Sequence, residues 1–184
     1  MRFVRFLAIL ICLCAGLSGN PPGQPGQPAP RERGDWGALQ YLLGDWTGEG
    51  SGGPGQGAGS FSFQPDLQGK ILVRKNRAEY PATRERAAFV HDDLMIVFRE
   101  PPDQRLHAVY FDNEQHVIRY EVGETADGGE IVFLSAPEPS APRYRLTYIR
   151  TGADRMKIRF EIAPPGHPEQ FATYIEAAAR RAAH

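Results

Sequence analysis

The chain has 184 residues, of which 41% are hydrophobic and 23% are charged, a size and composition that suit one globular domain. Its 21 basic and 22 acidic residues give a formal net charge of −1, and no basic stripe stands out. This balance argues against a nucleic-acid-binding protein, because such proteins neutralise phosphates with clustered Lys and Arg side chains.

The first 19 residues have the features of a secretory signal peptide. Arg2 and Arg5 come first, the apolar run FLAILICLCAGL follows, and the small residues Ser18 and Gly19 end the segment. The apolar run is short for a membrane span. We therefore expect residues 1–19 to be removed and the mature protein to be periplasmic or secreted, with a retained membrane anchor as the alternative.

Both cysteines, Cys12 and Cys14, lie in this leading segment. The mature chain therefore enters an oxidising compartment without a disulfide and depends on its core for stability. Acylation of Cys14 is a second alternative, which would make the protein a lipid-anchored lipoprotein. Leu13, just before it, is larger than the small residue that lipoprotein processing usually requires.

Residues 20–34, NPPGQPGQPAPRERG, are expected to form an extended tether. Proline removes backbone hydrogen-bond donors and glycine adds chain entropy, so this composition does not fold. Tethers of this kind often hold a domain away from a membrane or wall. We expect residues 35–184 to form a single folded domain.

The folded part begins with one helical candidate, DWGALQYLL at residues 35–43. The carboxylate of Asp35 is suited to accept hydrogen bonds from the amides at the start of a helix. Four apolar side chains of this segment are expected to pack inward: Trp36, Leu39, Tyr41 and Leu43.

From Gly44 onward, apolar and polar residues alternate, which predicts antiparallel strands with one buried face. The segment RMKIRFEI at 155–162 is the cleanest case, and DLMIVFRE at 93–100 is expected to group Leu94, Ile96 and Phe98 on one face. Turn residues separate the segments. The predicted strands are 45–51, 57–65, 69–79, 91–99, 104–112, 115–123, 129–135, 142–150, 154–163 and 170–179.

These short connections between successive strands predict an up-and-down meander. Since almost no helix is available to cover a sheet, the sheet must either close on itself or fold into two stacked halves. Closure removes the exposed edges and encloses an interior. We predict an all-β, lipocalin-like antiparallel β-barrel of about ten strands with a short N-terminal helix, and a sandwich is the alternative.

Glycines at nearly every second position mark the stretch LLGDWTGEGSGG at 42–53. A phosphate-binding loop would lead into a helix and carry a Gly-Lys-Ser/Thr sequence, and the only Gly-Lys pair, at 69–70, is followed by Ile71. Alternate glycines instead let a strand bend and let another backbone come close. We therefore interpret these glycines as structural, with Trp46 filling the closed end of the barrel.

The motif GDWTGEG, with Gly44, Trp46, Gly48 and Gly50, resembles the Gly-x-Trp start of the calycin group. That group comprises lipocalins, fatty-acid-binding proteins and nitrobindin-like barrels. Gly-x-Trp-x-Gly-x-Gly after a short helix is most similar to the ten-stranded, nitrobindin-type barrels and related exported bacterial barrels. The predicted strand order extends the likeness over most of residues 35–181. The resemblance implies a barrel that holds an apolar or planar ligand.

The resemblance suggests haem as one ligand to consider. Nitrobindin-type barrels bind ferric haem through a histidine on a late strand, but the three late segments here contain none. His167 lies in the loop PPGHPE and His184 is the terminal residue. The family's haem ligand has no counterpart at a matching position, so we predict no cofactor, with nitrobindin-like haem binding as the alternative.

The other histidines suggest no metal site. His91 and Asp93 share a face and make at most a partial site, because the intervening Asp92 points the other way. His107 and His116 lie on neighbouring strands, and His116 would contact a ligand only if it points inward. A lone inward arginine often pairs with a ligand carboxylate, as in fatty-acid-binding proteins. Arg74 lies on the same strand face as Leu72, which makes it the candidate for such a contact.

The expected ligand contacts are the inward aromatic residues together with Arg74 and His116. These residues are Trp46, Phe61, Phe63, Arg74, Phe98, Tyr110, His116, Tyr120, Tyr144, Tyr148 and Phe160.

Three classes of function fit such a barrel. We favour a monomeric binding protein that holds a small apolar ligand, such as a lipid or fatty acid, in its interior. An enzyme is less favoured, because the mature chain has no nucleophile elbow, Ser/His/Asp order or reactive cysteine. The third class is a structural or interaction protein of the cell envelope, in which the inward aromatics simply fill the barrel.

Overall fold

The computed structural model describes residues 34–49 and 58–183. These residues contain the strands of the sheet and the short helix that precedes them. The predicted signal peptide, residues 20–33 of the predicted tether, and three glycines of the 42–53 stretch (Gly50, Gly52 and Gly53) lie outside the described residues.

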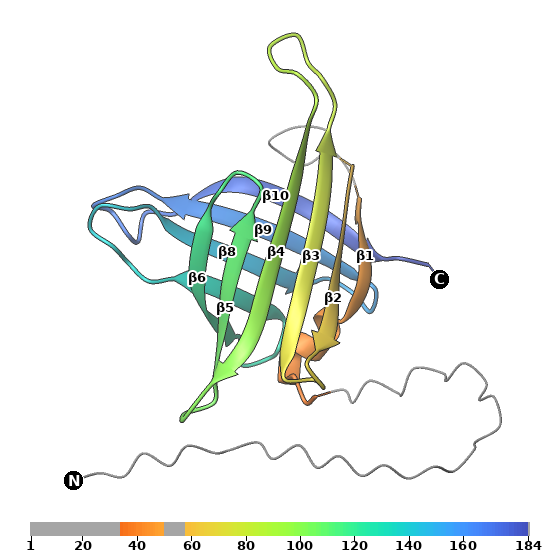
Figure 1. Cartoon of the computed structure of the whole chain (residues 1–184), viewed down its shortest axis with the longest axis vertical. Coiled ribbons are helices and arrows are strands. Elements are labelled where there is room, and N and C mark those ends of the chain that lie inside the picture. Colours follow the sequence, from red (N-terminus) through yellow and green to blue (C-terminus); the bar gives the residue numbers. More distant parts are fainter. Residues whose placement is uncertain (1–33, 50–57, 184) are drawn as a thin grey trace, which may run out of the picture. The chain divides into compact units, whose positions relative to one another are not determined.

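Ten antiparallel strands form a closed barrel in the order β1-β10-β9-β8-β7-β6-β5-β4-β3-β2, which confirms the predicted up-and-down topology. In Figure 1, β2 to β5 cross in front of β8 to β10. The elements are η1 (Gly37–Leu42), β1 (Gly44–Glu49), β2 (Ala58–Asp66), β3 (Ile71–Tyr80), β4 (Phe89–Glu100), β5 (Arg105–Asp112), β6 (Val117–Glu124), β7 (Glu130–Ser135), β8 (Arg143–Arg150), β9 (Arg155–Ala163) and β10 (Ala172–Arg181).

The short 3-10 helix η1 marks one end of the barrel, which we call the η1 end. The Asp35 carboxylate accepts a hydrogen bond from the Gly37 amide at 3.0 Å, and Leu39 and Leu42 are buried. The Trp46 indole N–H donates to the Leu42 carbonyl at 2.8 Å. Trp46 therefore joins η1 to β1, in agreement with its predicted place at a closed end.

The opposite end of the barrel carries the long β3–β4 hairpin, and we call it the hairpin end. Figure 1 shows this hairpin projecting beyond its neighbours. Tyr80 and Phe89 stack near its tip with ring centroids 4.5 Å apart, and the Arg86 guanidinium lies 4.1 Å from the Phe89 centroid. No helix of the part described is long and apolar enough to cross a membrane.

Strand β4 corrects one expectation, because its inward face carries Asp93, Met95 and Val97. Phe98 lies on the outer face, where its ring stacks against His107 with centroids 6.2 Å apart. Leu94 and Ile96 share that outer face and are only partly buried. From Leu94 to Phe98 both sets of alternate residues on β4 are apolar, so the alternation did not reveal which set faces inward.

The two glycines Gly48 and Gly59 allow β1, β2 and β3 to approach closely. A Cβ atom at Gly48 would lie 3.3 Å from the Gly59 carbonyl oxygen, and one at Gly59 would lie 3.4 Å from the Arg77 carbonyl oxygen. The distance at Gly48 is shorter than most Cβ contacts, so a side chain there would require the neighbouring strand to shift. This close approach supports the structural interpretation of the described part of the glycine-rich stretch.

The barrel closes where β1 pairs with β10, with Trp46 opposite Arg181. The Arg181 guanidinium donates to the Leu43 and Tyr41 carbonyls at 2.6 and 3.1 Å, and it lies 4.3 Å from the Trp46 ring centroid. It also pairs with Asp154 at 3.1 Å. One side chain thus connects both closing strands with the segment that contains η1.

Candidate ligand-binding site

Aromatic side chains pack together through the middle and the η1 end of the interior. Phe61 contacts Trp46, Phe63 and Tyr148 with ring centroids 6.1 to 6.2 Å apart, and Tyr148 contacts Phe133 at 5.8 Å. All five side chains are at most 6% exposed. This part of the barrel is therefore a packed core that leaves its aromatic rings almost no contact with solvent.

Above this core, toward the hairpin end, lies a buried polar cluster. The Arg74 guanidinium forms an ion pair with the Asp93 carboxylate, and both side chains are at most 8% exposed. The Asn76 amide donates to the second Asp93 oxygen at 2.8 Å. The Arg74 guanidinium also lies 5.4 Å from the Phe61 ring centroid, so it contacts the aromatic core below it.

His91 and Tyr110 extend the cluster toward the hairpin end. His91 Nε2 lies 3.4 Å from Asp93 Oδ2 and 3.1 Å from the Tyr110 hydroxyl, and Nδ1 lies 2.9 Å from Glu114 Oε1. The Tyr110 hydroxyl donates to Asp112 at 3.2 Å. These groups form one continuous chain from Arg74 to the rim, and strands β3, β4 and β5 supply most of it.

The electrostatics of the cluster favour the charged forms of His91 and Arg74 and the neutral form of Tyr110. The carboxylate of Asp93 raises the pKa of His91 to about 9, against burial and together with Glu114, so His91 is a cation at neutral pH. Burial lowers the pKa of Arg74, but Asp93 and nearby tyrosine hydroxyls raise it above its usual value. Burial also raises the pKa of Tyr110, as do the carboxylates of Asp93 and Asp112.

Asp112 completes the charge balance at the rim. Burial raises the pKa of its carboxyl group, but hydrogen bonds from the backbone and ring of His116 lower it further than burial raises it. Asp112 is therefore an anion. Within the cluster the cations Arg74 and His91 are thus both paired with carboxyl groups, Arg74 with Asp93 and His91 with Asp93 and Glu114.

Two buried polar atoms of this region lack hydrogen-bond partners among the described residues. They are Arg74 Nε and the Tyr148 hydroxyl oxygen. Burial raises the pKa of Tyr148 to about 12, while the charge of Arg74 acts in the opposite direction, so the two groups lie close together. Buried polar groups are usually paired, and an unpaired one costs about 1–3 kcal/mol. The Tyr148 hydroxyl and the Arg74 guanidinium thus face each other at the centre of the barrel, out of contact with solvent.

The wall formed by β8 and β9 is apolar and partly exposed. Tyr144 and Phe160 stack with ring centroids 6.0 Å apart, and Phe160 meets Tyr174 of β10 edge-on at 6.3 Å. Register places Phe160 beside inward-facing Leu146 and Ile158 beside inward-facing Tyr148. Tyr144, Ile158 and Phe160 nevertheless remain only partly buried. Solvent therefore reaches inward-facing apolar surface in the half of the barrel nearer the hairpin end.

The polar and apolar walls come together around Tyr120. Burial raises its pKa, and Tyr148, Arg74, Asp93 and Tyr144 all lie near enough to influence it. Tyr120 itself belongs to β6 and is 3% exposed. The site thus has charged and hydroxyl groups on β3 to β5, apolar surface on β8 and β9, and Tyr120 between them.

The structure places nine of the eleven residues that the sequence singled out inside the barrel, four of them in the packed core. The nine are Trp46, Phe61, Phe63, Arg74, Tyr110, Tyr120, Tyr144, Tyr148 and Phe160, all on inward faces. The predicted inward position of Phe98 was wrong, because its side chain lies on the outer face of the barrel. His116 does not point inward either. Its side chain is 55% exposed in the β5–β6 turn, where its ring lies 2.8 Å from Asp112.

Sequence reasoning placed His91 and Asp93 on one face of a strand but missed Asp93 as the buried partner of Arg74. The missed signal was parity, because Asp93 alternates with Met95 and Val97 and lies opposite Asn76 in register. Pairing across the sheet, which a single sequence does not display, is what places Asp93 beside Arg74. The described residues contain no group of three or more His, Cys, Asp or Glu side chains that could hold a metal ion.

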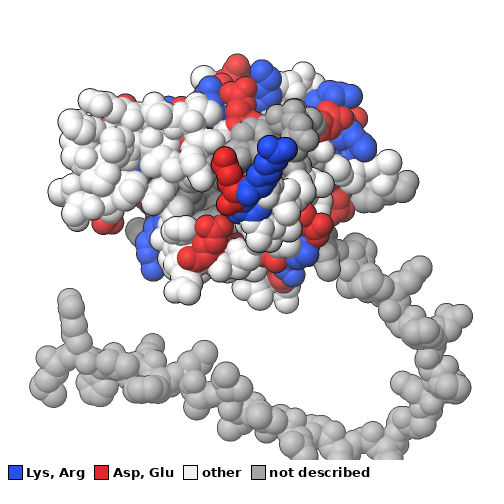
Figure 2. All heavy atoms as spheres, turned by 90° about the horizontal axis from the view of Figure 1, so that it is seen from above, with Lys and Arg blue, Asp and Glu red and all other residues white. Residues whose placement is uncertain are grey.

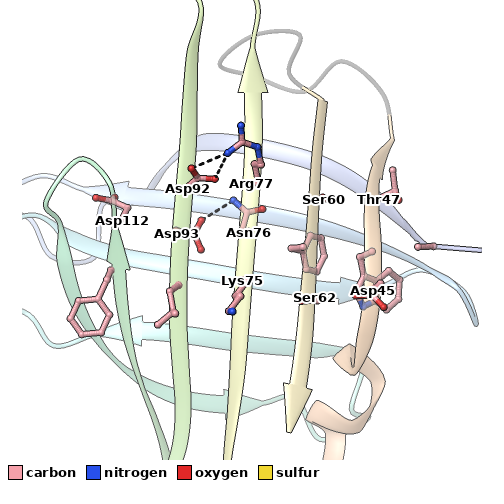
Figure 3. A pocket seen from close by; sticks show the side chains of 15 residues that line it. Asp45, Thr47, Ser60, Ser62, Lys75, Asn76, Arg77, Asp92, Asp93 and Asp112 are labelled. Carbon is pink, nitrogen blue, oxygen red and sulfur yellow. Dashed lines mark hydrogen bonds and ion pairs between the residues drawn. The ribbon is translucent and has the colours of Figure 1, made fainter. Parts of the chain in front are cut away.

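A hollow of about 650 Å³ lies on the outer surface of β1 to β5. Its lining consists mainly of five consecutive runs, 45–47, 60–62, 75–77, 92–94 and 111–112. Each run includes outward-facing residues, such as Asp45, Ser62 and Lys75 in the first three. Figure 3 shows these side chains spread across the strands. We call this hollow the outer groove.

Charges on the face seen from above are mixed, with Lys and Arg interspersed among Asp and Glu (Figure 2). The fold and the site define this part of the chain as a closed ten-stranded antiparallel barrel with a polar and aromatic interior. A scan against protein-family models found no match, and a search of curated proteins found none either.

Proposed function

We propose that the protein binds a small, mainly apolar molecule in the half of the barrel nearer the hairpin end. The observation that carries this proposal is the partly exposed, inward-facing surface of Tyr144, Ile158 and Phe160 beside a buried polar cluster. Ligand sites in barrels combine apolar walls with a few polar groups that fix orientation. The resemblance of GDWTGEG to the calycin motif supports the same function.

The charge balance favours a neutral polar group on the ligand. Arg74 is already paired with Asp93, so a ligand carboxylate would add an unbalanced negative charge to a buried site. A hydroxyl or carbonyl group of a ligand adds no charge to the site and still offers a hydrogen-bonding atom to the polar cluster. The ligand that fits best is lipid-like but uncharged, rather than a fatty-acid anion.

Titration calorimetry with dodecan-1-ol and dodecanoate tests this proposal. The two probes share one alkyl chain and differ in head-group charge, and we expect the alcohol to bind about tenfold more tightly at pH 7.5. Phe160→Ala should weaken alcohol binding several-fold, whereas Phe98→Ala, the same change on the outer face, should leave it unaltered. Failure of both probes to bind, or equal effects of the two variants, would overturn the proposal.

Export remains part of the proposal for residues 1–34. The protein should be made with its own leading segment and purified without detergent. Its intact mass then reports cleavage of the leading segment, acylation of Cys14 and any retained ligand. We expect a mass that begins near Asn20 plus the mass of a small neutral compound. A diacyl addition would instead favour the lipid-anchored alternative.

A further inference from the structure

The outer groove is built from two rows of side chains that run across the strands. In the first row, Asp45, Ser62, Lys75, Leu94 and Phe111 follow one another as register partners on β1 to β5. The second row is Thr47, Ser60, Arg77 and Asp92. Neighbouring strands lie about 4.8 Å apart, so the first row spans roughly 19 Å.

Closure of the barrel determines how this groove can recognise a partner. Strands β1 to β5 are each paired on both sides, so their backbone groups are occupied by the sheet itself. An extended peptide would have no strand edge to join, although edge pairing is the usual basis of peptide recognition by sheets. Recognition in the groove therefore depends on side chains.

The four outward-facing charged side chains of the groove, Asp45, Lys75, Arg77 and Asp92, cancel, and the other two carboxylates of its lining, Asp93 and Asp112, belong to the buried polar cluster. Arg77 pairs with Asp92 at 3.1 Å, as the dashed lines in Figure 3 indicate. Lys75 and Asp45, which also line the groove, carry opposite charges. A polyanion such as a nucleic acid would find no excess of positive charge here, so charge complementarity favours a neutral ligand.

One end of the groove is apolar and exposed. Phe111 is 41% exposed, and its register partner Val117 is 59% exposed. Leu94 lies beside Phe111 on the other side and is partly buried. Contiguous apolar surface of this kind often marks an interaction site. The flat ring of Phe111 offers a platform for an apolar ligand face.

We propose that the outer groove binds a linear oligosaccharide of neutral sugars. Sugar rings present hydroxyl groups at their edges and C–H groups on their faces. The hydroxyls of Thr47, Ser60 and Ser62 and the charged ends of Asp45 and Lys75 match the edges, and the Phe111 ring matches a face. A groove five strands wide accommodates several linked rings, and this site is separate from the barrel interior.

Calorimetry of the whole chain with cellohexaose, chitohexaose and laminarihexaose tests the inference. We expect at least one of these neutral hexasaccharides to bind, its disaccharide to bind at least tenfold more weakly, and Phe111→Ala to lower hexasaccharide affinity about tenfold. Phe98→Ala is the matched control, since it removes an outer-face ring away from the groove. An anionic oligogalacturonate of equal length should bind more weakly than the neutral chain.

Two outcomes would overturn the inference: no binding of any neutral hexasaccharide, or unchanged binding by Phe111→Ala. Dodecan-1-ol binding, measured on the same samples, reports on the interior site. It should be unaffected by Phe111→Ala, so that failure of the groove and failure of the interior site are told apart. Because Phe111 is exposed, its truncation should leave the fold intact.

Discussion

Asp93 is the residue on which the buried polar cluster depends. Its carboxylate pairs with Arg74, accepts from Asn76 and lies 3.4 Å from His91 Nε2. On the same strand, Asp92 points outward and pairs with Arg77, whose side chain is 54% exposed. Adjacent aspartates of one strand thus provide a buried and an exposed ion pair for comparison.

Asp93→Asn should lower the free energy of unfolding by about 3–5 kcal/mol, because it leaves the Arg74 charge buried without a counter-charge. Asp92→Asn should cost less than about 1 kcal/mol, since solvent screens the exposed pair. Urea unfolding followed by tryptophan fluorescence measures both. The double variant Arg74→Met/Asp93→Asn should recover most of the loss, and no recovery would contradict the pairing argument.

His91 predicts a pH dependence of stability. Its pKa is raised to about 9 in the folded state, so the folded protein binds this proton more tightly than the unfolded chain does. The stabilisation is therefore complete below the unfolded pKa of about 6.5 and is lost as pH rises toward 9. Since His91 is partly exposed, we expect this loss to be about 1–2 kcal/mol.

Thermal unfolding between pH 6 and pH 9.5 checks this expectation. His91→Gln should flatten the decline in melting temperature across that range, whereas His167→Gln, a change in the β9–β10 loop, should not. A decline of equal steepness in His91→Gln and the unaltered protein would show that other groups produce it.

At the scale of the element, the success of sequence reasoning depended on how different the two faces of a strand are. In β9, Lys157 and Glu161 alternate with Met156 and Ile158, and the predicted inward face is the observed one. In β4, both alternate sets are apolar, and the predicted face was wrong. The polar cluster escaped prediction for a related reason, because a single sequence does not show that Asp93 lies opposite Asn76 and beside Arg74.

The close approach of β1, β2 and β3 makes a prediction about Gly48. Gly48→Val should lower the free energy of unfolding by about 1–3 kcal/mol, because its Cβ would lie 3.3 Å from the Gly59 carbonyl oxygen and its methyl groups would crowd the neighbouring strand. Gly123→Val on β6 is the matched control, since a Cβ there meets no atom within 4 Å. Equal losses in the two variants would contradict a role for strand proximity.

At the scale of the whole molecule, the barrel depends on pairing the first strand with the last. β1 offers only four register partners to β10, whereas β9 and β10 pair over eight. Non-local pairing of this kind incurs the loop-closure entropy of nearly the whole domain. Side chains that bridge the closing strands should therefore contribute more to cooperativity than similar side chains elsewhere.

Arg181 is such a bridge, and its neighbour Arg180 is a natural control. Arg181→Ala removes two hydrogen bonds to the Leu43 and Tyr41 carbonyls, the pair with Asp154 and the contact with Trp46. Arg180 faces outward and makes only a partly exposed pair with Glu49 at 3.3 Å. We expect Arg181→Ala to cost about 2–4 kcal/mol and Arg180→Ala less than about 1 kcal/mol.

Hydrogen exchange distinguishes loss of closure from general destabilisation. If Arg181 holds the two ends together, amides of η1, β1 and β10 should exchange faster in Arg181→Ala while those of β4 to β6 keep their protection, because the seam then opens as a local unit. Uniformly faster exchange across all ten strands would mean that the barrel opens only by global unfolding. In that case the seam would be as stable as the rest of the sheet, and the bridging role of Arg181 would be refuted.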